Sequence, residues 1–112
     1  MTINEYQRLA LTTLNRDQEK KDMLVNGAMG LCGESGEVID LVKKHLFHGH
    51  ELKREKLLEE LGDVAWYLAV TAYALDCDLE TVLKDNVEKL KRRYPEGFDA
   101  ERSKNREKYG VE

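Results

Sequence analysis

Two pairs of acidic residues, each spaced three positions apart, are the feature of this sequence that most constrains its fold. Glu34 and Glu37 form the first pair, and Glu60 and Asp63 form the second. Residues at positions i and i+3 of an α-helix lie on one face. Two such helices packed antiparallel would bring four carboxylates together, where they repel one another unless a cation neutralises them. Oxygen ligands in this number suit Mg²⁺ or Mn²⁺. We therefore expect a divalent metal site whose ligands are Glu34, Glu37, Glu60 and Asp63.

Apolar residues repeat with the helical period along most of the chain. The pattern predicts two long helices, over about residues 23–46 and 52–75, and a shorter helix over about residues 79–93. Thr2 and Glu5 have the spacing of a capping box, which predicts a further helix near the N-terminus. A chain of 112 residues forms one small domain. We therefore expect an all-α bundle of four or five helices.

Glycine recurs at every third position near the start of the first long helix, at Gly27, Gly30, Gly33 and Gly36. Each glycine inside a helix costs about 1 kcal/mol relative to alanine. A sequence that repeats this cost is expected to need the missing side chain, because a neighbouring helix or a ligand approaches closely.

The composition excludes several classes of protein. Charged residues make up 36% of the chain, and the formal net charge is −4. This mixture argues against a partner that is a nucleic-acid polymer, since such proteins carry a basic stripe. No apolar run approaches the roughly 20 residues of a membrane span, and the N-terminus lacks a signal-peptide pattern. Cys32 and Cys77 fit reduced packing residues better than a disulfide. We expect a cytoplasmic protein without membrane association.

Three histidines, His45, His48 and His50, lie close to Gly49. Three histidines at this spacing are compatible with a transition-metal site. Glycine and histidine are also typical of a helix C-terminus, where histidine interacts favourably with the helix dipole. We favour the helix C-terminus, and contact of one histidine with a ligand stays open.

The residues from 33 to 38 and from 59 to 68 resemble the MazG-like family of all-α nucleoside triphosphate pyrophosphohydrolases. That family carries an E-x-x-E pair, a variable gap and an E-x-x-D pair, as this chain does. Residues 86–98 also resemble the family's downstream block, which contains Lys-Leu-x-x-Arg-Tyr-Pro. The resemblance covers about residues 28–98. Many members carry a further glutamate where this chain has Gly33, which leaves the number of metal ions open.

The resemblance implies Mg²⁺-dependent hydrolysis of a nucleoside triphosphate, an NTP or a dNTP and either standard or non-canonical, to the monophosphate and pyrophosphate, with Mn²⁺ as a substitute metal. It implies a MazG-like helical catalytic domain over residues 1–98, a charged C-terminal tail over residues 99–112, and assembly into a homodimer or homotetramer. The implied roles are general base for Glu37 or Glu60, phosphate binding for Lys89 and Arg93, and contact with the sugar or base for Tyr67 and Asn86.

Two other functions use similar residues. A di-iron or di-manganese carboxylate bundle typically needs Glu-x-x-His on two helices, whereas the residues three positions after Glu34 and Glu60 are both acidic. A non-catalytic helical bundle that binds a nucleotide or a protein would carry the acids as surface charges. Metal-dependent turnover separates that alternative from an enzyme, because a fold does not establish an activity.

Overall fold

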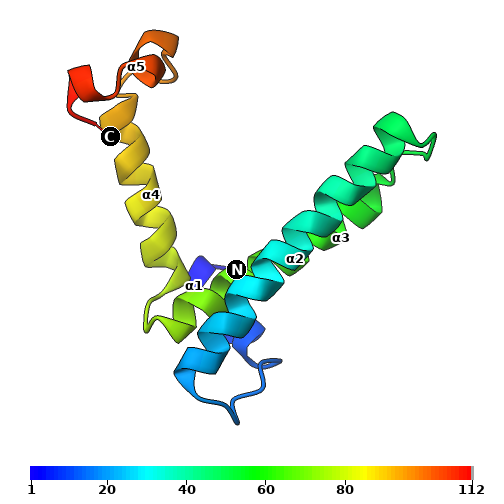
Figure 1. The fold of residues 1–112 in the computed structure, drawn as a ribbon. Coiled ribbons are helices and arrows are strands. Elements are labelled where there is room, and N and C mark those ends of the chain that lie inside the picture. The colour runs from blue at the N-terminus through cyan, green and yellow to red at the C-terminus, as the bar shows by residue number, and fades with distance from the viewer. Residues whose placement is uncertain (112) are drawn as a thin grey trace. The chain divides into compact units, whose positions relative to one another are not determined.

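The computed structural model describes residues 1–111, which form five α-helices and one 3₁₀-helix (Figure 1). These are α1 (Ile3–Leu11), α2 (Lys20–Phe47), α3 (Arg54–Ala74), α4 (Leu79–Arg93), α5 (Ala100–Lys104) and the 3₁₀-helix η1 (Glu107–Tyr109). Residues 1–111 contain no β-strand. The predicted all-α fold is confirmed. None of the helices in this range is long and apolar enough to cross a membrane.

The chain divides into two compact units, Met1–Leu79 and a second that begins at Glu80. The first unit contains α1, α2 and α3, and the second contains most of α4 with α5 and η1. The predicted boundary at residue 98 between a catalytic domain and a tail stays a prediction.

Short polar signals determine where the first two helices begin. The Thr2 hydroxyl accepts a hydrogen bond from the backbone N–H of Glu5 at 3.0 Å, so Thr2 caps the N-terminus of α1. Helix α2 begins at Lys20, three residues before the predicted start. The carbonyl of Glu19 accepts hydrogen bonds from the N–H groups of Asp22 and Met23 at 3.0 Å each. A first turn that is polar and exposed carries no apolar period, which is why the periodicity missed it.

Helices α2 and α3 form an antiparallel hairpin (Figure 1). The two helices approach closely at Gly27 and Gly30. A Cβ atom on Gly27 would lie 2.5 Å from Oγ1 and 3.3 Å from Cα of Thr71, and a Cβ atom on Gly30 would overlap the ring of Tyr67. The predicted close approach is therefore confirmed at these two glycines. At Gly33 and Gly36 a Cβ atom would meet nothing within 4 Å, so no neighbouring helix accounts for these two glycines, and approach of a ligand to them stays a prediction.

Helix α1 packs on α3 through a small apolar core. Buried Ala10, Ala69 and Leu79 form its centre, and Tyr6 and Trp66 pack against them. The indole N–H of Trp66 donates to the carbonyl of Ala10 at 3.0 Å, so the ring is fixed at the end of α1.

Gln7 is a buried polar side chain within this core, and the sequence patterns did not indicate it. Its Nε2 donates to the carbonyls of Ala69 at 3.1 Å and Cys77 at 3.3 Å, while its Oε1 accepts from the N–H of Leu79 at 3.0 Å. One side chain therefore joins α1, α3 and the first residue of α4.

Replacing Gln7 with leucine is expected to lower the free energy of unfolding by about 1–3 kcal/mol, because the N–H of Leu79 would stay buried without a partner. Urea titration followed by circular dichroism measures this loss. Gln7→Glu keeps the acceptor but turns a carboxylate toward two carbonyls. The folded-state pKa of the new carboxyl group should be raised, so the free energy of unfolding of this variant should fall further as the pH rises. A Gln7→Leu protein as stable as the wild type would contradict this role.

The second unit is held together by α5 at the end of α4. Arg102 donates from Nε to the carbonyl of Arg93 at 2.7 Å and from Nη2 to that of Arg92 at 3.4 Å. Asp99 caps α5 by accepting from the N–H groups of Glu101 and Arg102. The residues expected as a charged tail therefore contain a capped helix and the 3₁₀-helix η1.

Candidate metal centre

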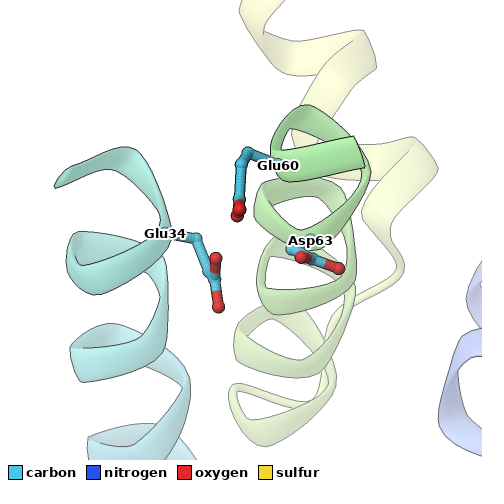
Figure 2. A group of neighbouring side chains, drawn as sticks. All are labelled: Glu34, Glu60 and Asp63. Carbon is cyan, nitrogen blue, oxygen red and sulfur yellow. The ribbon is translucent and has the colours of Figure 1, made fainter. Parts of the chain in front are cut away.

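Three of the four predicted ligands come together between α2 and α3. Figure 2 shows Glu34 reaching from α2 toward α3, with Glu60 and Asp63 on neighbouring turns of α3. One carboxylate oxygen from each of the three residues lies within 4.8 Å of the other two. The antiparallel register that places Gly30 against Tyr67 also places Glu34 opposite the acidic pair of α3, one turn further along the hairpin.

The three carboxylates differ in exposure and in their partners. Glu60 is buried, with only 6% of its surface exposed, whereas Glu34 is half-buried and Asp63 is exposed. The ammonium of Lys56, one turn before Glu60 on α3, lies 3.2 Å from Oε1 of Glu60. One lysine offsets part of the charge of the three acids, and the remaining negative charge favours a cation.

A hydrogen bond between Glu34 and Glu60 shifts the pKa values of these two carboxyl groups in opposite directions. The pKa of the Glu34 carboxyl is raised, first by its hydrogen bond to Glu60 and then by burial and by the negative charges of Glu60, Asp63 and Glu37. The pKa of Glu60 is lowered by the same hydrogen bond and by the ammonium of Lys56, against the opposing effect of burial. Three carboxylate oxygens within 4.8 Å of one another are a donor set that Mg²⁺ or Mn²⁺ fits.

Divalent-metal affinity is expected to fall as the pH is lowered toward the pKa of Glu34, because a metal ion and a proton compete for this carboxylate. The sign follows from the raised pKa, since the protonated, non-binding form persists to higher pH than in an ordinary glutamate. Calorimetric Mn²⁺ titrations in buffers of different ionisation enthalpy measure the protons released. Glu34→Gln should bind more weakly and release fewer protons. Equal affinity as the pH is lowered would contradict competition between metal and proton.

Glu37 lies outside the group of three. Its side chain is exposed on α2, although its charge still contributes to raising the pKa of Glu34. The predictions that Glu37 is a fourth ligand, and that Glu37 or Glu60 is the base, stay predictions.

Tyr67 lies one turn beyond Asp63 on α3, as the sequence predicted. It is half-buried, packs over Gly30, and meets the ring of Trp66 edge to face, with centroids 4.9 Å apart and an interplanar angle of 88°. Its predicted contact with the sugar or base stays a prediction.

Asn86, Lys89 and Arg93 belong to α4, within the second unit. Lys89 and Arg93 line a small cavity of about 170 Å³ together with Arg92 and the segment at Gly110. The Nε of Arg93 donates to the carbonyl of Val111 at 3.3 Å. The predicted roles of these residues in binding substrate stay predictions.

The three histidines lie at the end of α2, as expected for a helix C-terminus. The N–H of His48 donates to the carbonyl of Lys44 at 3.0 Å, and Nδ1 of His45 lies 2.9 Å from the carbonyl oxygen of His50. Gly49 takes a positive φ of 73°. No histidine among residues 1–111 belongs to the group of metal-ligating side chains.

Two residues beside the carboxylates were not predicted from the sequence. Lys56 precedes Glu60 by four positions, and this spacing is a readable signal for an ion pair on a helix. Tyr6 of α1 is the other: burial and the charge of Asp63 raise the pKa of its phenol, which therefore stays protonated near the site. No local pattern links Tyr6 to Asp63, because the two meet only through the packing of α1 on α3.

The fold and the site together describe a helical protein with a candidate divalent-metal centre of three carboxylates. The family model of the MazG nucleotide pyrophosphohydrolase domain matches residues 26–98. The chain therefore belongs to the MazG nucleotide pyrophosphohydrolase family, and the predicted resemblance is confirmed.

One curated relative is the Gene 37 protein of Mycobacterium phage L5, which is 44% identical over 73 residues. The match covers 62% of this chain, and the chain spans 64% of the length of that relative. No solved structure matches this chain significantly.

Proposed function

We propose that this protein hydrolyses a nucleoside triphosphate to the monophosphate and pyrophosphate with the help of Mg²⁺. The observation that supports this proposal is the group of three carboxylates from two facing helices, one oxygen of each within 4.8 Å of the others, in a chain of the MazG family. Substrates of this kind belong to the nucleotide pool of the cytoplasm, which is the compartment that we propose.

Glu34, Glu60 and Asp63 would hold the metal ion, and Glu37 would add a fourth carboxylate. A divalent ion bound there supplies neutralisation of the phosphate charge that develops during the reaction. Mn²⁺ is expected to substitute for Mg²⁺, because both prefer oxygen ligands.

Glu37 is our choice for the general base. Glu60 is buried, pairs with Lys56 and accepts a hydrogen bond from Glu34, so its oxygens already have partners. Glu37 is exposed one turn from Glu34 and is therefore accessible to a water molecule. A carboxylate within hydrogen-bond reach of water can accept its proton as the water attacks a phosphorus atom.

The remaining roles concern the substrate. Tyr67 would contact the base or sugar from α3, together with Asn86. Lys89 and Arg93 would bind phosphate oxygens, because charge-assisted hydrogen bonds to phosphate are strong.

The protein is also proposed to act as a homodimer or homotetramer. Several apolar side chains of the α2–α3 hairpin are exposed, namely Met29 (68%), Ile39 (62%), Leu61 (52%) and Leu68 (37%). Exposed apolar surface of this kind is typical of a protein–protein interface. Sedimentation equilibrium should therefore give the mass of two or four chains, and a monomer at micromolar concentration would contradict the assembly.

The direct test of function is to incubate the protein with a panel of standard and modified nucleoside triphosphates, with Mg²⁺, with Mn²⁺ and with EDTA. Metal-dependent release of pyrophosphate with an equal amount of monophosphate is expected. Release of orthophosphate together with the nucleoside diphosphate would indicate cleavage at a different bond of the phosphate chain. Binding of nucleotide without turnover across the panel would favour the non-catalytic bundle.

A further inference from the structure

A cavity of about 400 Å³ lies in the first unit, between α1 and the turn that joins α3 to α4. Two arginines line it, Arg8 of α1 and Arg16 of the segment that follows α1. Tyr73 near the end of α3 and the turn residues Asp76 and Asp78 line it as well. Sites for small molecules in proteins typically have volumes of about 300–1,000 Å³, so this cavity is large enough for one such molecule.

The cavity is separate from the candidate metal centre. Tyr73 follows Asp63 by ten residues on α3, which corresponds to about 15 Å along a helix. No residue that lines the cavity belongs to the group of three carboxylates or to the residues proposed to contact the triphosphate. A ligand in this cavity therefore occupies a second site.

The charges on the cavity wall are unequal once their partners are counted. Asp76 is already paired, because the ammonium of Lys20 lies 2.8 Å from its Oδ1. Neither Arg8 nor Arg16 forms an ion pair within residues 1–111. The charges that remain on the wall are therefore two guanidinium groups and the single carboxylate of Asp78. An excess of positive charge around a cavity favours an anionic ligand.

Contacts with uncharged groups restrain Arg16 at the cavity wall. Its Nη2 donates to the carbonyl of Leu11 at 3.5 Å, and its Cζ atom lies 5.4 Å from the centroid of the Tyr73 ring. The Nζ atom of Lys20 lies 3.8 Å from the same centroid. A cation over an aromatic ring is attracted to it but keeps its charge. The Arg16 guanidinium is therefore partly positioned before a ligand binds, which lowers the entropic cost of binding.

We propose that this cavity binds the phosphate monoester of a sugar, with the phosphate on Arg8 and Arg16 and a sugar hydroxyl on Asp78. A phosphate monoester carries a charge of about −1.5 to −2 at pH 7, which the two guanidinium groups match. Their planar forks bind phosphate oxygens through pairs of charge-assisted hydrogen bonds. An ionised carboxylate only accepts hydrogen bonds. Asp78 therefore repels a bare phosphate but accepts from a hydroxyl, so it selects a ligand that carries both groups.

Calorimetric titration of the full chain with ribose 5-phosphate in EDTA tests this site without any hydrolysis. In the absence of metal the three carboxylates of the candidate metal centre repel phosphate, so binding there is not expected. One molecule should bind to each chain. Arg8→Gln and Arg16→Gln should each weaken this binding about tenfold or more, because each removes a charge-assisted contact. Both arginines are exposed, so the variants should keep the wild-type circular dichroism spectrum.

Asp78→Asn tests the part of the site assigned to the sugar. Asparagine is as good a residue as aspartate before a helix, so α4, which begins at Leu79, should keep its start. Wild-type protein should bind ribose 5-phosphate more tightly than inorganic phosphate. This preference should shrink in Asp78→Asn, because the repulsion of bare phosphate is lost. Arg54→Gln removes an exposed arginine outside the cavity and is the control for net charge, so it should keep the wild-type affinity.

A deoxynucleoside monophosphate titrated in the same way distinguishes two sources of such an ester. Binding tighter than that of ribose 5-phosphate assigns the cavity to a nucleotide, and weaker binding assigns it to a free sugar phosphate. Both results support the site if Arg8→Gln and Arg16→Gln weaken them.

Three results would overturn the inference. They are a wild-type protein that binds no ribose 5-phosphate at millimolar concentration, an Arg54→Gln variant weakened as much as Arg8→Gln, and binding that is lost in Lys89→Gln but kept in both cavity variants, which would assign the phosphate to α4. The test involves no triphosphate, so it is independent of the proposed function. If ribose 5-phosphate binds as expected while no triphosphate is hydrolysed, the proposed function fails and this inference stands.

Discussion

Replacing Asp63 with asparagine is expected to lower kcat for pyrophosphate release by at least about 10²- to 10³-fold, the range seen when one electrostatic contact to the transition state is removed. Asp63 is one of the three residues whose carboxylate oxygens lie within 4.8 Å of one another, and an amide is a neutral and weaker ligand for Mg²⁺. The loss should appear in both kcat and kcat/KM at saturating Mg²⁺.

The fold of the Asp63→Asn protein should survive, because Asp63 is exposed and its charge repels Glu34 in the absence of metal. Its melting temperature without metal should equal or exceed that of the wild type, and the rise in melting temperature on adding Mg²⁺ should be lost. Asp40→Asn is the matched control. Asp40 is an α2 carboxylate paired with Lys43 and Lys44, outside the group of three, so its loss should change turnover little. Equal loss in both variants would show that net charge matters rather than this site.

A methyl group at position 30 is expected to destabilise the protein and to move Tyr67. In the Gly30→Ala protein the new Cβ atom would overlap the Tyr67 ring, so the ring or the helix must shift. Overpacking of this kind typically costs about 1–3 kcal/mol. Since Tyr67 lies one turn from Asp63, the shift should also raise KM for the triphosphate. Urea titration and steady-state kinetics measure the two effects.

Gly33→Ala is the matched control on the same helix. A Cβ atom at residue 33 meets nothing within 4 Å, so the protein should gain up to about 1 kcal/mol from the better helix propensity of alanine. Opposite signs for Gly30→Ala and Gly33→Ala are therefore expected. Two substitutions with the same effect on stability would contradict the close packing of α2 on α3 at Tyr67.

The long helices could be predicted from the sequence because their signals are local. Apolar periodicity placed α2 and α3 to within three residues at each end, and the capping box at Thr2 located α1. The sequence predicted the close packing at Gly27 and Gly30, but the same pattern of glycines does not mark a helix contact at Gly33. A run of glycines does not show which member faces the neighbouring helix, because that depends on the register between α2 and α3.

The candidate site could be predicted from the sequence only in part. The spacing of the acid pairs indicated a cluster of carboxylates, since positions i and i+3 lie on one face of a helix whatever the tertiary fold. The sequence could not show that Glu37 lies outside the group of three. Residues 34 and 37 differ in direction by about 60° around the helix, and which of these directions faces α3 depends on how α2 packs against it. Gln7 and Tyr6 were missed for a related reason: their contacts on α3 lie more than fifty residues away along the chain.

The measurement that tests the central claim most directly is the position of Mn²⁺ in a crystal of the wild-type protein, located by anomalous scattering at the manganese edge. An anomalous peak within bonding distance of carboxylate oxygens from Glu34, Glu60 and Asp63 is predicted, with a second nearby peak if the site holds two ions. The peak should be absent from Asp63→Asn crystals soaked at the same concentration. Manganese bound elsewhere, for example at the histidines after α2, while these three carboxylates stay free of metal in an active enzyme, would contradict the account.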